Sequence, residues 1–169
     1  PASAKFATIG GGVANNCSGE KTVKYGSMRE YILSLKMILA DGQEAEFNYL
    51  NEGQIKEKQA QTDLECEIYR RMWDLSISNH NLIENSRLKV NKSSTGYWLH
   101  DLLSDCHCDE AECRNNNSLS HCGIDLTKLI CGSQGTLGII TEIKLKTILQ
   151  PKASGLLLAS FTDTLPATS

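Results

Sequence analysis

The pattern of residues 31–40 limits the fold more than any other part of the sequence. Apolar residues occupy every second position of this run: Leu33, Leu35, Met37 and Leu39. Because successive side chains of a strand point to opposite faces, the alternation predicts a β-strand with one fully apolar face. Asp41-Gly42 follows, and this dipeptide favours a tight hairpin turn because glycine tolerates positive φ. A second strand is therefore predicted over residues 43–49.

A helix is predicted after a charged stretch, residues 51–61, that is itself expected to be a loop or an irregular helical lead-in. Thr62 and Glu65 have the spacing of a capping box. Apolar residues then recur at spacings of four, four and three, the stripe of an amphipathic helix ending near residue 79: Leu64, Ile68, Met72 and Leu75. Shorter helical segments are expected over residues 82–88, 97–103 and 125–129.

A long, half-exposed strand is predicted over residues 137–148. One of its faces is expected to carry Ile139, Thr141, Ile143, Leu145 and Thr147. Pro151 marks a break, and residues 155–161 form one more apolar run typical of a strand. The elements together predict an α+β fold with a mostly antiparallel sheet and flanking helices.

Length and charge limit the class of protein. The chain has 169 residues, which suffices for one domain with a sizeable core, and a net charge of −3. This charge argues against a nucleic-acid partner, because nucleic-acid-binding surfaces usually carry a clustered basic excess. The longest apolar runs fall far short of the roughly 20 residues that span a bilayer, so no membrane span is expected.

Seven cysteines are present, and their distribution is uneven. Cys17, Cys66 and Cys131 sit among apolar or small residues and are expected to be buried or half-buried thiols. The other four lie in an acidic, Asn-rich stretch, residues 104–122, that interrupts the pattern like an inserted surface loop. An odd, uneven set is a poor disulfide framework, so a reducing compartment, the cytoplasm, is expected. Peripheral association with a membrane stays open.

The inserted stretch could also hold a metal ion. Four cysteines and two histidines supply enough ligands for a tetrahedral zinc site: Cys106, Cys108, Cys113, Cys122, His107 and His121. The paired Cys-x-x-Cys knuckles of recognisable zinc sites are missing, so a solvated loop is favoured and no metal is assigned. A small metal-binding or interaction module built on this loop is the alternative reading of the chain's function.

A first glycine-rich segment, residues 7–19, is a candidate binding loop. It reads ATIGGGVANNCSG and is followed by Lys24-Tyr25-Gly26. Glycine lets backbone N–H groups approach an anion, while Thr8, Asn15, Asn16 and Ser18 add polar side chains. A flexible turn region is the competing interpretation. The segment has neither the Rossmann nor the P-loop spacing, which excludes those two motifs.

A second glycine-rich segment, residues 131–141, leads into the long predicted strand. It reads CGSQGTLGIIT. Three glycines before an apolar strand indicate a tight turn with backbone exposed to a partner. A helix C-cap at Gly132 followed by an ordinary connection is equally compatible with the spacing.

The two segments, in this order and at this separation, resemble the FAD-binding domain of the vanillyl-alcohol oxidase/p-cresol methylhydroxylase flavoprotein superfamily. "GSQGTLGIITEIKLK" is similar to the family signature "GSEGTLGIITE", with Gln134 where Glu is usual. "SSTGYWLHDLL" resembles the stretch that often precedes this signature. The likeness covers the chain apart from the Cys-rich insert. It points to the branch with glycolate oxidase subunits, D-lactate dehydrogenases and D-2-hydroxyglutarate dehydrogenases.

The resemblance implies a fold, a cofactor and a set of contact residues. The chain would be the second half of a two-subdomain FAD-binding domain, with FAD as the cofactor and a D-2-hydroxy acid as the substrate that loses a hydride to the flavin. The residues that would line the flavin or the pyrophosphate are Ser3, Thr8, Gly10, Gly11, Val13, Asn15, Ser18 and Gly19. Gly138, Ile139 and Ile140 would present backbone groups to the adenosine or flavin end, and Gly135 and Thr141 would support that turn.

The resemblance also implies boundaries. Residues 1–150 would belong to the FAD-binding domain, and residues 151–169 would form a linker and the first strand of a substrate domain. An earlier FAD subdomain is expected before Pro1, and the catalytic residues are expected after Pro151. The chain alone is therefore expected to be inactive, and no catalytic residue is assigned within it.

Overall fold

The fold consists of one antiparallel sheet with its helices on one side. The computed structural model describes residues 2–60, 62–87, 90, 96–104, 123–149, 151–153 and 155. Its helices are η1 (Ala2–Lys5), α1 (Ile9–Ala14), α2 (Thr22–Tyr25), η2 (Met28–Tyr31), α3 (Glu52–Gln59), α4 (Leu64–Ser78), α5 (His80–Asn85) and α6 (Thr127–Ile130). Its strands are β1 (Ile32–Ile38), β2 (Glu44–Asn51), β3 (Leu103–Ser104), β4 (Gly123–Asp125) and β5 (Ile139–Leu145).

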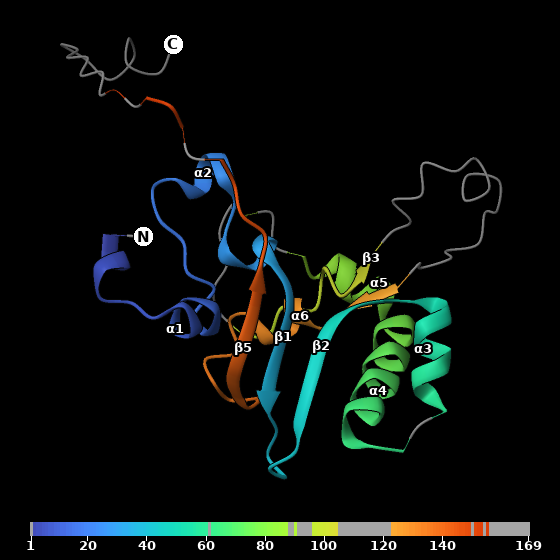
Figure 1. Ribbon diagram of the computed structural model, residues 1–169. Helices are drawn as coiled ribbons and strands as arrows, with labels where there is room; N and C mark the ends of the chain where they lie inside the picture. Colours follow the sequence, from blue (N-terminus) through green and yellow to red (C-terminus); the bar gives the residue numbers. More distant parts are fainter. Residues whose placement is uncertain are drawn as a thin grey trace.

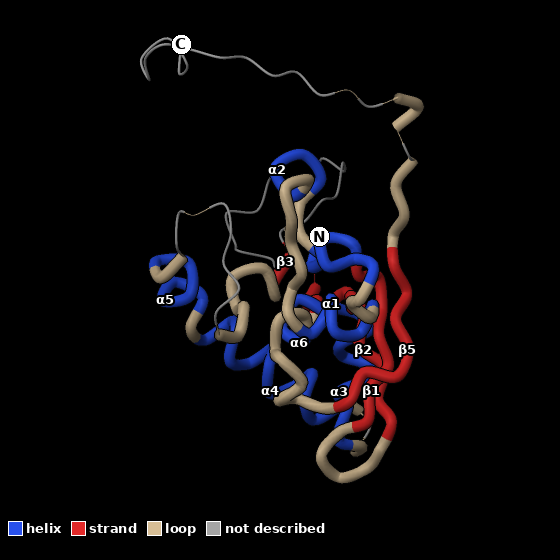
Figure 2. Tube along the Cα trace, turned by 90° about the vertical axis from the view of Figure 1, so that its left-hand side faces the viewer, coloured by secondary structure: helices blue, strands red, loops and turns tan. Residues whose placement is uncertain are grey.

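Within the described residues the sheet has five strands in the order β3-β4-β2-β1-β5, and every neighbouring pair is antiparallel. The helices lie to one side of the strands (Figure 2), so the core forms between the two layers. Figure 1 shows α3 and α4 next to β2, whereas α1 and α2 lie at the β5 edge. The predicted α+β class with a mostly antiparallel sheet is confirmed.

The hairpin is confirmed at the predicted turn. Strands β1 and β2 pair with Leu35 opposite Phe47 and Met37 opposite Ala45, and all four side chains are buried. The Leu39 N–H donates to the Gln43 carbonyl at 2.9 Å, and Gly42 has the positive φ of 83° that the turn requires.

Two irregularities in the β1–β5 pairing correct the predicted faces. The register shifts between Ile32 and Ser34 and between Lys36 and Met37. Ile32 is therefore buried while Leu33 is 51% exposed. On β5 the second shift places Ile140 against the core and leaves Ile139 and Thr141 exposed. An irregular register of this kind reverses side-chain alternation locally, which no simple periodicity predicts.

The predicted long helix is present, but its cap and part of its stripe differ. Asp63, not Thr62, is the N-cap of α4, and its carboxylate accepts the Cys66 N–H at 2.7 Å. Glu65 does not close a capping box, because its carboxylate accepts the Glu46 N–H at 2.8 Å. Tyr69 is fully buried, whereas Leu75 is 42% exposed.

Other local predictions were wrong in instructive places. Residues 52–59 form a regular helix, because Asn51 and Gln54 make a reciprocal capping box. Residues 97–103 contain no helix and lead instead into β3. The predicted glycine-rich loop of residues 9–14 is helix α1, which Thr8 caps by accepting the Gly11 N–H at 3.1 Å.

Some predictions fall outside the described residues. These include all the cysteines and histidines of the inserted stretch and nearly all of the expected strand at residues 155–161. The thiols of Cys66 and Cys131 are buried and that of Cys17 is half-buried, as predicted. No helix among the described residues is long and apolar enough to cross a membrane.

Candidate functional site

The two glycine-rich segments lie side by side although they are far apart in the sequence. The Gly132 N–H donates to the Val13 carbonyl at 3.0 Å, and the Gln134 N–H donates to the Ala14 carbonyl at 2.9 Å. These bonds join the end of α1 to the turn that precedes β5. The sequence predicted each segment separately as a binding element, and the fold makes them one surface at the β5 edge (Figure 1).

Asn16 connects the first glycine-rich segment to η2 and to Cys131. Its φ of 45° lies in the left-handed region, which asparagine tolerates better than most residues. Its buried Oδ1 accepts the backbone N–H of Arg29 at 3.1 Å and lies 3.6 Å from the Cys131 thiol, which points toward it. Asn16 thereby bonds to the turn of the second segment and to η2.

Arg29 lies directly behind both segments and is only 7% exposed. Its Nε donates to the Lys128 carbonyl at 3.1 Å, and its Nη2 donates to the Cys131 carbonyl at 2.9 Å. The guanidinium stacks over the Trp98 ring, 4.7 Å from its centroid. Burial lowers the pKa of Arg29 from its usual value, although Cys131, Asp101 and Glu30 oppose this. Burial likewise raises the pKa of the Cys131 thiol to about 11, so this thiol is protonated near neutrality.

Helix α1 presents an open backbone to solvent. A Cβ added to Gly10 would meet no atom of the described residues within 4 Å, so packing within the described part of the chain does not require glycine there. At Gly11 a Cβ would lie 3.1 Å from the Thr8 Oγ1. The position of the capping side chain therefore accounts for glycine at residue 11. Thr8 and Asn15 are exposed at the two ends of the helix. Val13 differs, because its side chain is fully buried in the core and its carbonyl is used by Gly132.

The second glycine-rich segment contains four residues with positive φ. These are Gly132, Gln134, Gly135 and Gly138. Gly135 faces open space, whereas a Cβ at Gly138 would lie 2.4 Å from Met37 Cε and 2.5 Å from the Ile38 carbonyl oxygen. The protein's own packing thus explains Gly138, but it does not explain Gly135 beyond its φ of 77°.

Strand β5 forms an edge of the sheet. One side of it pairs with β1, and no strand among the described residues pairs with its other side. Ile139 and Thr141 are exposed, while Ile140 packs against the core. This arrangement leaves backbone groups at the start of β5 on the same edge as α1.

The remaining predicted contact residues lie at the margin of this surface. Ser3 is in η1, where its carbonyl accepts the N–H groups of Phe6 and Ala7. Gly19 is exposed and donates its N–H to the Thr22 Oγ1 at 2.9 Å, and Ser18 precedes it half-buried. No described contact joins these three residues to the second segment.

Exposed apolar side chains accompany the glycines. Phe6, which precedes α1, is 90% exposed, Ile9 at the start of α1 is 61% exposed, and Ile139 at the start of β5 is 69% exposed. A mixture of polar groups, open backbone and exposed apolar side chains suits a ligand that carries both charged groups and a flat ring system.

Arg29 and Cys131 were not predicted as site residues. Asn16 was predicted to offer its polar side chain to a ligand, but its Oδ1 is buried and accepts the Arg29 N–H instead. Asn16 follows another asparagine in a glycine-rich segment, a weak signal for a left-handed position. Nothing in the sequence distinguishes Arg29 from a solvated surface arginine, because its partners are backbone carbonyls about 100 positions away.

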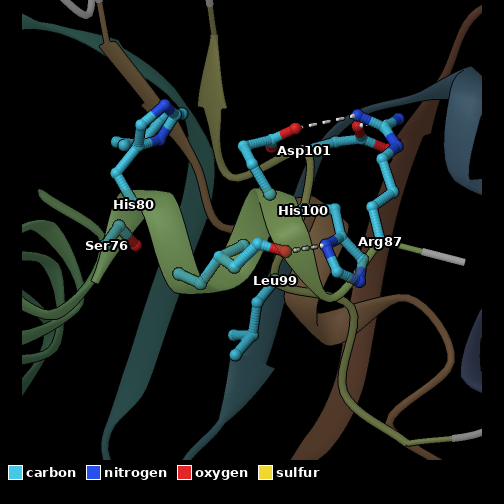
Figure 3. A pocket seen from close by; sticks show the side chains of 9 residues that line it. Ser76, His80, Arg87, Leu99, His100 and Asp101 are labelled. Atoms are coloured by element: carbon cyan, nitrogen blue, oxygen red, sulfur yellow. Dashed lines mark hydrogen bonds and ion pairs between the residues drawn. The ribbon is translucent and has the colours of Figure 1, made fainter.

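A separate cavity of about 340 Å³ lies between α4, α5 and the chain before β3. Figure 3 shows its polar lining, in which Arg87 pairs with Asp101 at 2.8 Å and His100 Nδ1 lies 3.0 Å from the Ile83 carbonyl. Ser76 contributes a buried Oγ that has no hydrogen-bond partner among the described residues. Within the described part of the chain, no three Cys, His, Asp or Glu side chains are placed to hold a metal ion.

Comparison with known proteins agrees with the resemblance seen in the sequence. A family model described as an FAD binding domain matches residues 1–48. D-2-hydroxyglutarate dehydrogenase of Pseudomonas putida is 27% identical over 161 residues, 95% of this chain and 14% of the relative. D-lactate dehydrogenase of Anaerostipes hadrus is 28% identical over 149 residues, 88% of this chain and 18% of the relative. Glycolate oxidase subunit GlcD of Bacillus subtilis is 26% identical over 161 residues, 95% of this chain and 20% of the relative.

The chain therefore spans at most a fifth of the length of these curated relatives. The family match covers α1, η2 and β1, and the relatives extend the likeness through the turn and β5. The chain is thus similar to an FAD binding domain over residues 1–48, and over most of its length it is similar to the D-2-hydroxyglutarate dehydrogenase, D-lactate dehydrogenase and glycolate oxidase subunit named above.

Proposed function

We propose that the chain forms part of the FAD-binding domain of an FAD-dependent oxidoreductase that oxidises a D-2-hydroxy acid of the lactate, glycolate or 2-hydroxyglutarate type. The observation that carries the proposal is the junction of the two glycine-rich segments through Gly132 and Gln134. The relatives supply the reaction class, since the names of the Pseudomonas putida, Anaerostipes hadrus and Bacillus subtilis proteins each contain a 2-hydroxy acid.

The surface fits FAD on physical grounds. Gly10 sits in a helix, where glycine is less stable than alanine by about 1 kcal/mol, yet no atom of the described residues lies within reach of a Cβ there. Close approach of a ligand to the backbone would explain this glycine. The exposed Thr8 and Asn15 offer hydrogen-bonding side chains, and Phe6, Ile9 and Ile139 offer apolar contact for a heterocycle.

Each predicted contact residue then has a role. Thr8, Gly10, Gly11 and Asn15 would face the flavin or the pyrophosphate, and Ser3, Ser18 and Gly19 would border it. Val13 supports the surface from the core. Gly138, Ile139 and Ile140 would offer backbone groups at the β5 edge, with Gly135 and Thr141 supporting the turn. Bound FAD supplies the hydride acceptor, while this chain's residues hold and orient it.

The domain boundaries belong to the same proposal. Residues 1–150 are assigned to the FAD-binding domain and residues 151–169 to the connection with a substrate domain. An additional FAD subdomain and the substrate domain would complete the site, since the relatives are far longer than this chain. A cytoplasmic location is proposed, supported by the free thiols of Cys17, Cys66 and Cys131.

The test uses the full-length protein that contains this chain. We expect the purified protein to carry FAD, visible as flavin absorbance, and to reduce that flavin when a D-2-hydroxy acid is added. Gly10→Glu would place a carboxylate in the space left open by glycine and is expected to abolish FAD binding. Gly53→Glu is a matched control, because Gly53 occupies the same position after its N-cap in α3 and lies outside the proposed site.

The outcomes separate clearly. Loss of flavin in Gly10→Glu with retention in Gly53→Glu supports the proposal. A folded wild-type protein that neither contains nor takes up FAD would refute it, as would equal retention of FAD in both variants.

A further inference from the structure

Arg29 holds a buried positive charge in an unusual setting. Its side chain is 7% exposed, and none of the ion pairs that join described residues includes it. Its guanidinium instead donates to the carbonyls of Lys128 and Cys131 and stacks on Trp98. Buried arginines are usually paired with a carboxylate. An arginine whose guanidinium donates to backbone carbonyls instead is expected to fix the geometry of that backbone.

Three segments meet at this residue. The Arg29 N–H donates to Asn16 beside α1, and the Arg29 carbonyl accepts the Lys128 Nζ at 2.9 Å. Its guanidinium Nη2 donates to the Cys131 carbonyl, immediately before the Gly132 N–H that bonds to α1. Main-chain and side-chain groups of the same residue therefore hold both sides of the glycine-rich surface.

We propose that Arg29 is a positioning residue, which keeps the two glycine-rich segments at the separation that cofactor binding requires. This inference rests on the proposed function. Arg29 does not reach the open surface itself and acts through Asn16 and the Cys131–Gly132 peptide.

The guanidinium shape is part of the assignment. Nε and Nη2 donate in one plane to two carbonyls three residues apart, a fork that an ammonium group cannot reproduce. The planar face against Trp98 requires the same shape. Lysine would retain the charge and one hydrogen bond, whereas methionine would retain only bulk.

The experiment compares four forms of the full-length protein: wild type, Arg29→Lys, Arg29→Met and Tyr69→Phe. Tyr69→Phe is the control for lost stability, because its hydroxyl bonds to the backbone of Asn48 on β2 and lies away from both segments. FAD affinity is measured by reconstitution of the apoprotein, flavin geometry by visible circular dichroism, and folding by thermal denaturation.

Arg29→Met is expected to weaken FAD binding by about 10- to 100-fold, the range for losing charge-assisted hydrogen bonds, and to change the flavin dichroism. Arg29→Lys should restore part of the affinity. Tyr69→Phe should lower the melting temperature without altering the affinity or the spectrum. Where Arg29→Met does not accumulate as folded protein, Arg29→Lys provides the same comparison with the control.

Wild-type affinity and spectrum in a folded Arg29 variant would overturn the inference and leave the proposed function intact. An equal loss of affinity in Tyr69→Phe would also overturn it, because stability alone would then explain the effect. Absence of FAD from the wild-type protein would overturn the proposed function and this inference together.

Discussion

The guanidinium of Arg29 lies against the backbone of Gly132, so closely that a Cβ on residue 132 would be 3.1 Å from Nη2. The same Cβ would lie 3.4 Å from the Cβ of Asn16, and Gly132 has a φ of 91°. Glycine at this position thus serves the contact between the two segments and not only the turn.

Gly132→Ala is therefore expected to destabilise the protein by about 1–3 kcal/mol, through the unfavourable φ and the crowding of Arg29. The measurement is chemical denaturation of the apoprotein. Gly135→Ala is the matched control, because Gly135 also has positive φ but faces open space. It should cost less than Gly132→Ala, and equal losses would show that the contact with Arg29 is unimportant.

Ser76→Ala is expected to stabilise the protein by about 1 kcal/mol. The Ser76 Oγ is buried and finds no hydrogen-bond partner in the described part of the chain, and an unsatisfied buried polar group costs about 1–3 kcal/mol. Alanine also has the higher helix propensity at this position in α4. Thermal denaturation of both forms tests this. A marked decrease in stability would mean that the hydroxyl has a partner in solution, supplied from the cavity.

The N-cap of α4 gives a pH-dependent prediction. Hydrogen bonding to Cys66 lowers the pKa of Asp63 from its usual value. A carboxylate with a lowered folded-state pKa stabilises the fold above its unfolded pKa of about 3.9, and this contribution disappears as the pH falls through the folded value. Asp63→Ala should cost about 1 kcal/mol at pH 7, and the difference from wild type should shrink below about pH 4.

Two variants control this test. Asp63→Asn keeps a capping oxygen at every pH, so it should stay close to wild type at pH 7 and lack the loss at low pH. Thr62→Ala should have little effect, because Thr62 is not the cap. The free energy of unfolding of each variant is measured by denaturation across this pH range. A larger loss of stability in Thr62→Ala than in Asp63→Ala would contradict the assigned cap.

The sequence predicted the regular parts of the fold well. The Asp41-Gly42 hairpin and the α4 stripe through Ile68 and Met72 depend on local alternation and periodicity, which short segments express by themselves. The positions of Leu33 and Thr141 were not predictable in this way. They depend on register shifts between β1 and β5, which are set by pairing between distant segments.

The candidate site shows the same division. Its two glycine-rich segments could be found because glycine clusters are visible in any sequence. Their junction could not, since it consists of backbone bonds between Val13 and Gly132 and of an arginine whose partners are carbonyls. Helix α1 was missed because three consecutive glycines lower helix propensity, and the Thr8 cap with burial of Val13 outweighs that preference.

Gly10→Ala is expected to separate stability from FAD binding. A methyl group at residue 10 meets no atom within 4 Å in the part of the chain that the structure describes, and alanine favours the helix over glycine by about 1 kcal/mol. The apoprotein should therefore become slightly more stable. The same methyl group would occupy the space through which FAD is proposed to approach the α1 backbone. FAD affinity should therefore fall while the melting temperature of the apoprotein rises.

FAD affinity and the melting temperature of the apoprotein are measured on the same preparation of each variant. Gly53→Ala, at the corresponding position of α3, should raise stability similarly and leave FAD affinity unchanged. If Gly10→Ala binds FAD as tightly as wild type, the cofactor does not approach the protein at this glycine. The open space at Gly10 would then not be the site of cofactor approach.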